Sequence, residues 1–507
     1  MIRRSFLFVS FRLLLVQANV LSRRTTPGYP SKPGVPRQPV DSAIPSIPSI
    51  PISYADAIPI LKLLNSHGPK ASDFGKWWTS SLGLEYKGVD YNIGPSPDDL
   101  VLHLVNEQEY VTTPIWNVIG IINGTLPDQV VVVGNHRDAW IAGGAGDPNS
   151  GSAALNEIIR AFGNAVQRGW KPLRTIVFAS WDGEEYGLLG STEWVEEYLP
   201  WLTDASVAYV NIDIGCVGPE WRVASSPLLN NIMYEVTGLV LSPNQTVEGQ
   251  TIRDVWSGHI FTMGSGSDFT AFQDFAGIPS VDMGFASDPN SPVYHYHSNY
   301  DSFYWMSTYG DPGFRYHAAS ARILGLFVAK LVETPVLPLN TTDYAKALKD
   351  YITEVKSKLD SPPPSTKGEQ VDAEQEDAEQ EARFRPTPPL TGHDSDMESS
   401  LRKAFSRLDR AVTTLHTTAT KFDSHAAQLA TEVKDLPWWR WFSWWRLYRR
   451  IQVANQKLKM LERQFLYAEG LDGRNWFKHI VFAPGLWTGY SGGEFLFIYI
   501  YLRIYRK

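Results

Sequence analysis

The stretch VVVVGNHRDAWIAGGAGDPNSG, residues 130–151, decides the fold predicted for this chain. Four consecutive valines are typical of a strand that is covered on both faces, as in a parallel α/β sheet. Such sheets bind their ligands just beyond the carboxyl ends of the strands. His136 follows the valines directly and Asp147 follows a glycine-rich turn, so both are expected at that edge.

Further β-rich runs at 175–180, 207–212 and 278–285 extend this sheet, with helical patterns between several of them. The clearest helical pattern is 152–168, where apolar residues recur at helical spacing. Apolar segments at 100–105 and 115–122 around a polar turn predict a hairpin. We therefore predict an α/β fold with a mixed, largely parallel sheet flanked by helices. The segment 54–67 predicts another helix, broken near Pro59.

Long helical patterns at 344–359, 397–432 and 454–466 dominate the second half of the chain and predict an α-helical domain there. An acidic insert bounded by prolines, at about 361–395, interrupts it and has the composition of a disordered segment. The predicted domains are a signal-like or unnatural start at 1–23, a segment at 24–87, an α/β domain at 88–340, a helical domain at 341–494 and an aberrant apolar tail at 495–507.

Composition limits the possible partners and the cellular route. A net charge of -8 without a long basic run argues against nucleic acid as the main partner. With one cysteine, Cys216, no intrachain disulfide or thiolate zinc cluster can form, so metal ligands must come from His, Asp and Glu. Sequons at Asn123, Asn244 and Asn340 suit a secretory protein, whether vacuolar, membrane-anchored or extracellular. Residues 1–22 outline a signal peptide, although Arg12 interrupts the apolar run.

Acidic groups and a histidine follow other predicted strands and loops in the same way. Glu184 and Glu185 follow the run 175–180, Asp213 follows the run 207–212, and His297 lies in the loop PVYHYHSNYDS. Acidic groups gathered at one sheet edge repel each other unless a cation holds them. Oxygen and imidazole ligands in this ratio favour zinc over manganese or cobalt.

The motifs NHRDAW, GDPNSG, FASWDGEEYGLLGSTEWVEE, NIDIG and YHSNYD resemble those of the glutamate carboxypeptidase II and transferrin-receptor-like family of co-catalytic zinc peptidases. The resemblance covers residues 24–490. It implies a zinc aminopeptidase-like domain, a helical dimerisation-type domain, a peptide substrate and a homodimer. It also implies that 24–87 is the remnant of an apical, protease-associated domain.

The resemblance assigns roles to eight residues of this chain. Asp147 bridges two zinc ions, His136 and Asp213 complete one site, and Glu185 and His297 complete the other. Glu184 is the general base that takes a proton from the zinc-bridging water and passes it to the leaving amine. Tyr296 donates a hydrogen bond to the oxyanion, and Asp138 orients the imidazole of His136.

Other implied residues concern calcium and the substrate. A structural calcium ion is implied at Thr26, Tyr29, Glu193 and Glu196. The residues expected to bind substrate are Arg222, Gly266, Ser267 and Tyr490. Because GIPSVDMGFASDP lacks the arginines of the glutamate-cleaving members, we expect no strong preference for acidic residues. The direction of cleavage, from the amino or the carboxyl end, stays open.

Two features leave alternatives open. Most of the family's long N-terminal segment and its final helices have no counterpart in this sequence, so an inactive truncated product stands beside the active peptidase. Transferrin-receptor-like proteins share the fold without needing metal, so a catalytically silent receptor-like relative is the other alternative, although all five ligands and Glu184 are present. The segment WWRWFSWWRLYRR, residues 438–450, fits either a membrane interface or a packing surface of a helix bundle or dimer. Aromatic residues on all sides of this segment favour packing.

Overall fold

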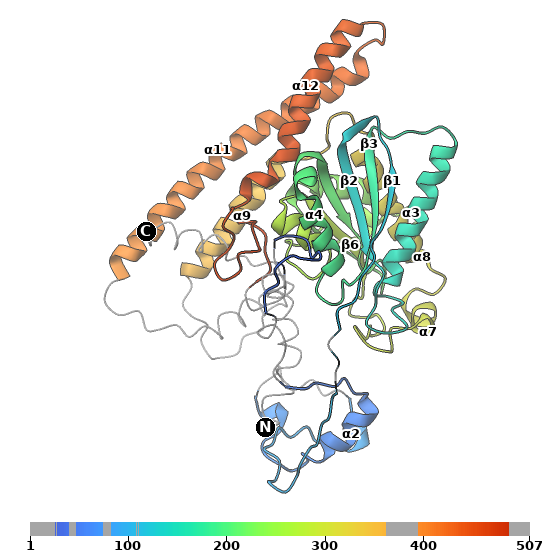
Figure 1. The fold of residues 1–507 in the computed structure, drawn as a ribbon, viewed down its shortest axis with the longest axis vertical. Coiled ribbons are helices and arrows are strands. Elements are labelled where there is room, and N and C mark those ends of the chain that lie inside the picture. Colours follow the sequence, from blue (N-terminus) through green and yellow to red (C-terminus); the bar gives the residue numbers. More distant parts are fainter. Residues whose placement is uncertain are drawn as a thin grey trace. The chain divides into compact units, whose positions relative to one another are not determined.

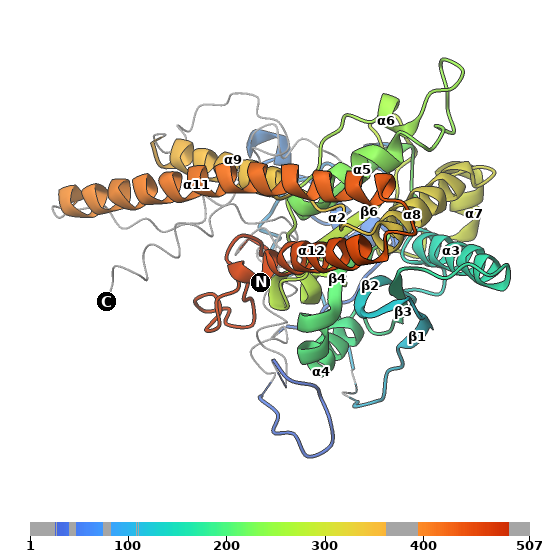
Figure 2. The ribbon, with the colours of Figure 1, turned by 90° about the horizontal axis from the view of Figure 1, so that it is seen from above.

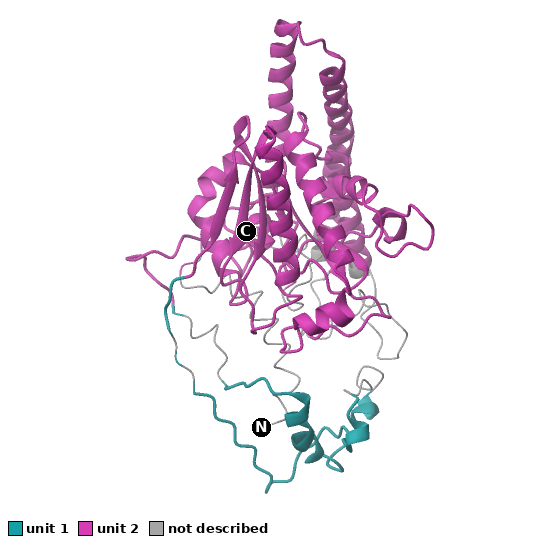
Figure 3. Ribbon diagram, turned by 90° about the vertical axis from the view of Figure 1, so that its right-hand side faces the viewer, with its two compact units in different colours: residues 1–16, 39–114 teal, residues 17–38, 115–507 magenta. Residues whose placement is uncertain are grey.

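The computed structural model describes residues 26, 28–39, 47–74, 83–107, 109, 111–360 and 394–485 (Figure 1). The signal-like start, residues 361–393 of the acidic insert, Tyr490 and the apolar tail lie outside the described residues. The chain forms two compact units, shown in Figure 3. Unit 1 comprises residues 1–16 and 39–114, and unit 2 comprises residues 17–38 and 115–507.

Unit 1 contains α2 (Tyr54–Lys62) and short 3-10 turns at Ala71–Phe74 and Glu85–Lys87. Ser53 caps α2, because its side chain accepts a hydrogen bond of 3.1 Å from the backbone N–H of Asp56. The predicted break at Pro59 is wrong. The helix passes through Pro59, which removes one backbone donor, and ends three residues later at Lys62.

Unit 2 is built on a six-stranded sheet with the order β1-β3-β2-β4-β6-β5. The strands are β1 (Val118–Ile122), β2 (Leu126–His136), β3 (Arg174–Trp181), β4 (Ser206–Asn211), β5 (Glu220–Ser225) and β6 (Ser280–Ala286). The four central strands are parallel, and β1 and β5 are antiparallel to their neighbours. The mixed, largely parallel sheet is therefore confirmed. The four valines of β2 lie at its centre and are almost completely buried.

The predicted hairpin between 100–105 and 115–122 is wrong. Residues 100–105 form no strand in the described structure, and β1 pairs antiparallel with β3 instead. Val118 lies opposite Ser180 and Ile122 lies opposite Ile176. An apolar run can pair with any strand that offers a free edge, so alternation along the chain does not reveal the partner.

Helices cover both faces of the sheet (Figures 1 and 2). α3 (Asn149–Gln167) and α8 (Arg315–Glu333) pack together on one face, and α4 (Leu189–Ala205) lies on the other. The prediction of a helix at 152–168 is confirmed by α3. Shorter helices are α5 (Asn230–Thr237), α6 (Ile252–Val255) and α7 (Phe303–Trp305), with π-helical turns at Ala271–Phe275 and Met306–Gly310 and a 3-10 turn at Pro227–Leu229.

The second half of the chain forms the helices predicted at 344–359 and 397–432, whereas the one predicted at 454–466 begins earlier, at Trp441, and ends at Met460. α9 (Thr341–Asp360) packs against α11 (Asp394–Asp435), which packs against α12 (Trp441–Met460), followed by a 3-10 turn at Glu462–Phe465. Leu447 and Ile451 of α12 are buried against Leu429 of α11. No helix among the described residues is both long enough and apolar enough to cross a membrane.

The turn between α11 and α12 carries an exposed aromatic surface, which we call the aromatic tip. Its residues are Trp438, Trp439, Trp441, Phe442, Trp445 and Tyr448, with side chains between 48% and 83% exposed. Arg446 and Arg449 lie over the rings of Phe442 and Trp445. Within the described chain these six side chains are not part of the core, unlike Leu447 between them.

Arg174 joins the start of β3 to the end of α8 and is completely buried. Its guanidinium donates to the side chain of Gln129 at 2.8 Å, to the carbonyls of Leu331 at 2.8 Å and Thr334 at 2.7 Å, and to that of Pro335 at 3.3 Å. Burial lowers the pKa of Arg174 to about 10, so the group keeps its charge at neutral pH. A cation is favourable here because carbonyls at a helix C-terminus carry partial negative charge.

We predict that Arg174→Met lowers the free energy of unfolding by about 3 kcal/mol, because buried carbonyl acceptors lose their donors. Urea titration followed by circular dichroism measures this change. The control is Arg160→Met, since Arg160 is exposed and pairs only with Glu157 on the surface of α3. It should change stability by less than about 0.5 kcal/mol. Equal losses in the two variants would contradict the role given to Arg174.

Candidate active site

Parallel pairing aligns the carboxyl ends of three central strands. His136, the last residue of β2, lies opposite Trp181, the last residue of β3. Gly134 of β2 lies opposite Asn211, the last residue of β4. The loops that follow these strand ends carry Asp147, Glu184, Glu185 and Asp213, so the register of the sheet delivers the acidic groups to one edge.

Two trios of side chains meet at this edge and share Asp147. In the first, Nε2 of His136 lies 2.9 Å from Oδ1 of Asp213 and 3.3 Å from Oδ1 of Asp147. In the second, Nε2 of His297 lies 3.2 Å from Oε2 of Glu185 and 3.3 Å from Oδ2 of Asp147. The potential ligand atoms of each trio all lie within 4.8 Å of one another. These two groups of residues can each hold a metal ion.

The donor set fits divalent cations. Asp147 presents one oxygen to each trio, and its buried Oδ1 forms no hydrogen bond within the described structure. Burial alone would raise the pKa of Asp147, but the contacts with His136 and His297 outweigh it and lower that pKa to about 2. Asp147 is therefore an anion at neutral pH. Carboxylate and imidazole donors in this combination suit zinc.

Glu184 lies next to Glu185 in sequence but belongs to neither trio. It is 4% exposed, and burial raises the pKa of its carboxyl group well above the ordinary value. The two consecutive glutamates thus have different surroundings. A buried carboxyl group that belongs to neither group of potential ligands is available for proton transfer.

Asp138 holds the turn that carries the two glutamates. Its Oδ1 accepts from the backbone N–H of Glu184 at 3.0 Å, and its Oδ2 accepts from that of Glu185 at 3.1 Å. The imidazole of His136 contacts Asp138 mainly through the backbone carbonyl, 3.0 Å from Nδ1, while the carboxylate is 3.8 Å away. The side chain predicted to orient His136 therefore also fixes the positions of Glu184 and Glu185.

Asp301 holds the turn before Asp147 through hydrogen bonds from backbone N–H groups, as Asp138 does for the two glutamates. Asp301 was not among the predicted site residues. Its two oxygens accept from the backbone N–H groups of Gly146 at 2.6 Å and Asp147 at 3.0 Å, and it also accepts from the hydroxyl of Tyr294 at 3.0 Å. Asp301 is 2% exposed. Its position in the motif YHSNYD, four residues after His297, was the only local signal.

The other predicted residues are placed as follows. The ring of Tyr296 stacks on that of His297 at 3.6 Å and is half exposed. Ser267, beside Gly266, is buried and accepts from the side chain of Asn211 at 2.8 Å. Arg222 lies on the edge strand β5 and forms a surface ion pair of 3.1 Å with Glu220.

The residues expected around calcium also approach one another. Glu196 accepts from the backbone N–H of Gly28 at 2.7 Å and from the indole of Trp476 at 2.8 Å, and Glu193 accepts from the N–H of Ser31. Thr26 is buried, whereas Tyr29 is 41% exposed. The two carboxylates therefore hold the loop 26–31 against α4.

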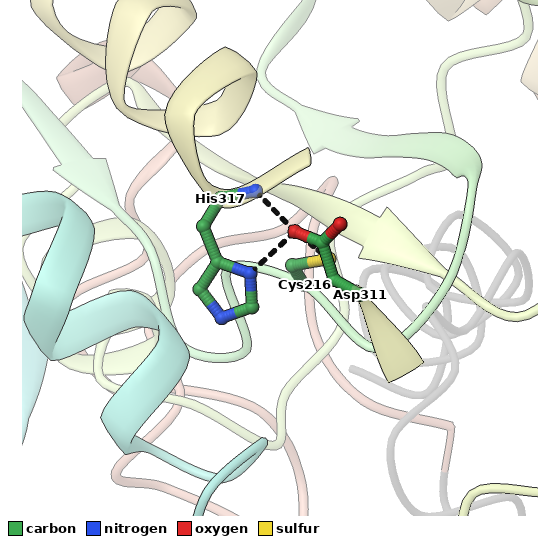
Figure 4. Close-up of side chains that lie close together, drawn as sticks. All are labelled: Cys216, Asp311 and His317. Atoms are coloured by element: carbon green, nitrogen blue, oxygen red, sulfur yellow. Dashed lines mark hydrogen bonds and ion pairs between the residues drawn. The ribbon is translucent and has the colours of Figure 1, made fainter. Parts of the chain in front are cut away.

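A third cluster, Cys216, Asp311 and His317, has a structural explanation (Figure 4). Oδ2 of Asp311 accepts from the backbone N–H of His317 at 2.9 Å and from its Nδ1 at 2.8 Å, and Oδ1 accepts from the N–H of Arg315 at 3.1 Å. Asp311 thus caps the start of α8. Burial raises the pKa of the Cys216 thiol, which disfavours the thiolate that a metal requires.

Two regions of the chain match known families. Residues 117–308 match peptidase family M28, and residues 403–499 match the transferrin receptor-like dimerisation domain. The first region contains both trios and Glu184, and the second contains the aromatic tip.

Three relatives illustrate the similarity. A probable glutamate carboxypeptidase of Arthroderma benhamiae is 40% identical over 451 residues, which are 88% of this chain and 54% of that protein. Aminopeptidase NAALADL1 of Mus musculus is 35% identical over 364 residues, 66% of this chain and 48% of that protein. Vacuolar protein sorting-associated protein 70 of Saccharomyces cerevisiae is 30% identical over 484 residues, 93% of this chain and 54% of that protein.

The chain spans about half the length of these relatives. Its match to peptidase family M28 coincides with the strands and loops that carry the two trios. Residues 117–308 therefore carry the features of peptidase family M28, and residues 403–499 those of a transferrin receptor-like dimerisation domain.

Proposed function

We propose that this chain is a di-zinc exopeptidase that hydrolyses peptide bonds. The observation that carries the proposal is the pair of trios that share Asp147, with the buried carboxyl group of Glu184 beside them. The match of residues 117–308 to peptidase family M28 supports it. The names of the relatives include a carboxypeptidase and an aminopeptidase, so both directions of cleavage belong to the proposal.

Each trio would hold one zinc ion, with Asp147 as the shared ligand. Zinc, when bound, supplies a Lewis acid that polarises a carbonyl group and acidifies a water molecule. Glu184 takes the proton of the attacking water and delivers it to the leaving amine. Tyr296, half exposed beside His297, is available to donate a hydrogen bond to the oxyanion.

We extend the proposal to the secondary sites. Calcium would bind beside the buried Thr26 and the carboxylates of Glu193 and Glu196, with Tyr29 in the same loop, and would add to the hydrogen bonds that hold this loop. Gly266, Ser267, Arg222 and Tyr490 would contribute to substrate binding.

A secretory or vacuolar location is also part of the proposal. The exposed Asn123 and Asn244 suit glycosylation, and the yeast relative is named for vacuolar protein sorting. Asn340 is partly buried, and its Oδ1 caps α9 by accepting a hydrogen bond of 2.9 Å from the backbone N–H of Asp343.

We predict that Glu184→Gln lowers kcat for a cleaved peptide by about a hundredfold or more, because the amide cannot accept a proton. Bound zinc, measured by inductively coupled plasma mass spectrometry, should stay at the wild-type level, since Glu184 lies outside both trios. Asp147→Asn should instead lower the zinc content, because it affects both trios.

The matched control for this experiment is Glu157→Gln, an exposed glutamate on α3 that pairs with Arg160. It should leave both zinc content and kcat unchanged. If folded wild-type protein binds zinc but cleaves no peptide of a broad panel, the peptidase proposal fails and the catalytically silent alternative holds.

We also infer that the chain forms a homodimer through its helical domain, because residues 403–499 match a dimerisation domain and the aromatic tip is exposed in the single chain. We predict that replacing Trp439, Trp441 and Trp445 by serine shifts the protein toward monomer in size-exclusion chromatography with light scattering. The reason is the loss of large aromatic contact areas.

The control replaces three exposed aromatic residues outside the helical domain, Phe303, Tyr304 and Tyr309, by serine. This variant should keep the wild-type mass. A tip variant that stays dimeric but no longer sediments with anionic vesicles would contradict the assignment and favour a membrane interface.

A further inference from the structure

Aromatic rings form a continuous row along the second trio. The ring of Tyr186 lies 5.1 Å from that of Trp140, the ring of Trp140 lies 6.1 Å from the imidazole of His297, and the ring of Tyr296 stacks on that of His297. Tyr186 is 71% exposed and Trp140 is 42% exposed. Neither belongs to a hydrophobic cluster among the described residues. Packing within the chain therefore does not account for these two rings.

The position of this row is tied to the trio itself. The backbone N–H of Trp140 lies 3.3 Å from Oε1 of Glu185 and donates to it. Tyr186 follows Glu185 directly in the chain. The two rings therefore keep a fixed place beside the proposed ligands Glu185 and His297, where the substrate residue next to the cleaved bond would lie.

The basic side chain nearest to this row in sequence is already engaged. The nearest arginine in sequence, Arg137, is engaged by the carboxylate of Asp182 at 3.3 Å and the carbonyl of Ser180 at 2.9 Å. Among the described residues no Lys or Arg forms an ion pair or a cation–π contact with Glu185, His297, Trp140 or Tyr186.

We propose that Trp140 and Tyr186 form an aromatic shelf that binds a large apolar or aromatic side chain of the substrate residue beside the cleaved bond. The inference rests on the proposed peptidase function and names its substrate class. The shelf offers flat apolar surface, with the geometry in which aromatic rings stack or meet edge to face. Two exposed rings without a basic side chain paired beside them thus favour an uncharged, bulky residue.

The experiment compares short peptides in which Phe, Leu, Gly or Glu occupies the position on either side of the cleaved bond. For the preferred side we expect kcat/KM for Phe to exceed that for Glu by about tenfold or more. In the double variant Trp140→Ala/Tyr186→Ala this ratio should fall to within about threefold of unity. The single variant Trp140→Phe, which keeps an aromatic ring, should retain most of the wild-type ratio. Trp201→Ala is the control, because Trp201 on α4 is similarly exposed and also contacts aromatic rings.

Binding is measured separately in a Glu184→Gln background by isothermal titration calorimetry with the same Phe and Glu peptides. If the double variant keeps the wild-type ratio of kcat/KM for Phe peptides to kcat/KM for Glu peptides, the proposed shelf is wrong and the peptidase function stands. If no peptide is cleaved, the peptidase function is wrong. The calorimetry then tests the shelf by itself. Equal affinity for the Phe and Glu peptides would overturn the shelf, and so would a preference for the Phe peptide that the double variant keeps.

Discussion

Parallel pairing of β2 with β3 and β4 is the constraint on which the rest of the structure depends. Backbone hydrogen bonds hold His136 opposite Trp181 and Gly134 opposite Asn211, so the loops after three strands start from one edge. A shift of one residue in β2 would exchange its two faces and move His136 away from Asp213. The valines resist such a shift only weakly, because both faces are equally apolar. Polar contacts at the strand end add specificity: Asn135 donates to the carbonyl of Ile212 at 2.8 Å, and Ser152 donates to Asn135.

The second constraint is electrostatic, because several buried carboxylates gather at this edge of the sheet and their negative charges must be stabilised. The carboxylates of Asp138 and Asp301 are stabilised by hydrogen bonds from backbone N–H groups, two for each carboxylate. Hydrogen bonds to a carboxylate stabilise its charged form and fix its orientation. These two residues therefore compensate their own charge and also define where Glu184, Glu185 and Asp147 stand. One or more oxygens of Asp147, Asp213 and Glu185 face His136 and His297, which is the arrangement that a pair of cations fits.

Several local features were predictable because they are written in short stretches of sequence. The buried strand of four valines, the helix after the GDPNSG turn and the long helices α9 and α11 all follow from periodicity, and the structure confirms them. The partner of β1 was not predictable, since the run 100–105 offered an equally apolar but incorrect neighbour. The edge strand β5 was also missed. It is a short segment whose alternation is only partly apolar, and its place depends on β6, which follows it by more than fifty residues.

By itself, the sequence determined the class of the fold, the types of residue that surround the site and the strand ends that carry them. Motifs that resemble those of the glutamate carboxypeptidase II and transferrin-receptor-like family also selected His136, Asp147, Glu185, Asp213 and His297, which the structure brings into two trios. Only the tertiary structure decided that Asp138 supports both glutamates, that Asp301 supports Asp147 and that Trp140 and Tyr186 form an exposed row beside His297. The reason is physical. Periodicity and short motifs record contacts within one segment, whereas these contacts join segments that meet only after the sheet has paired.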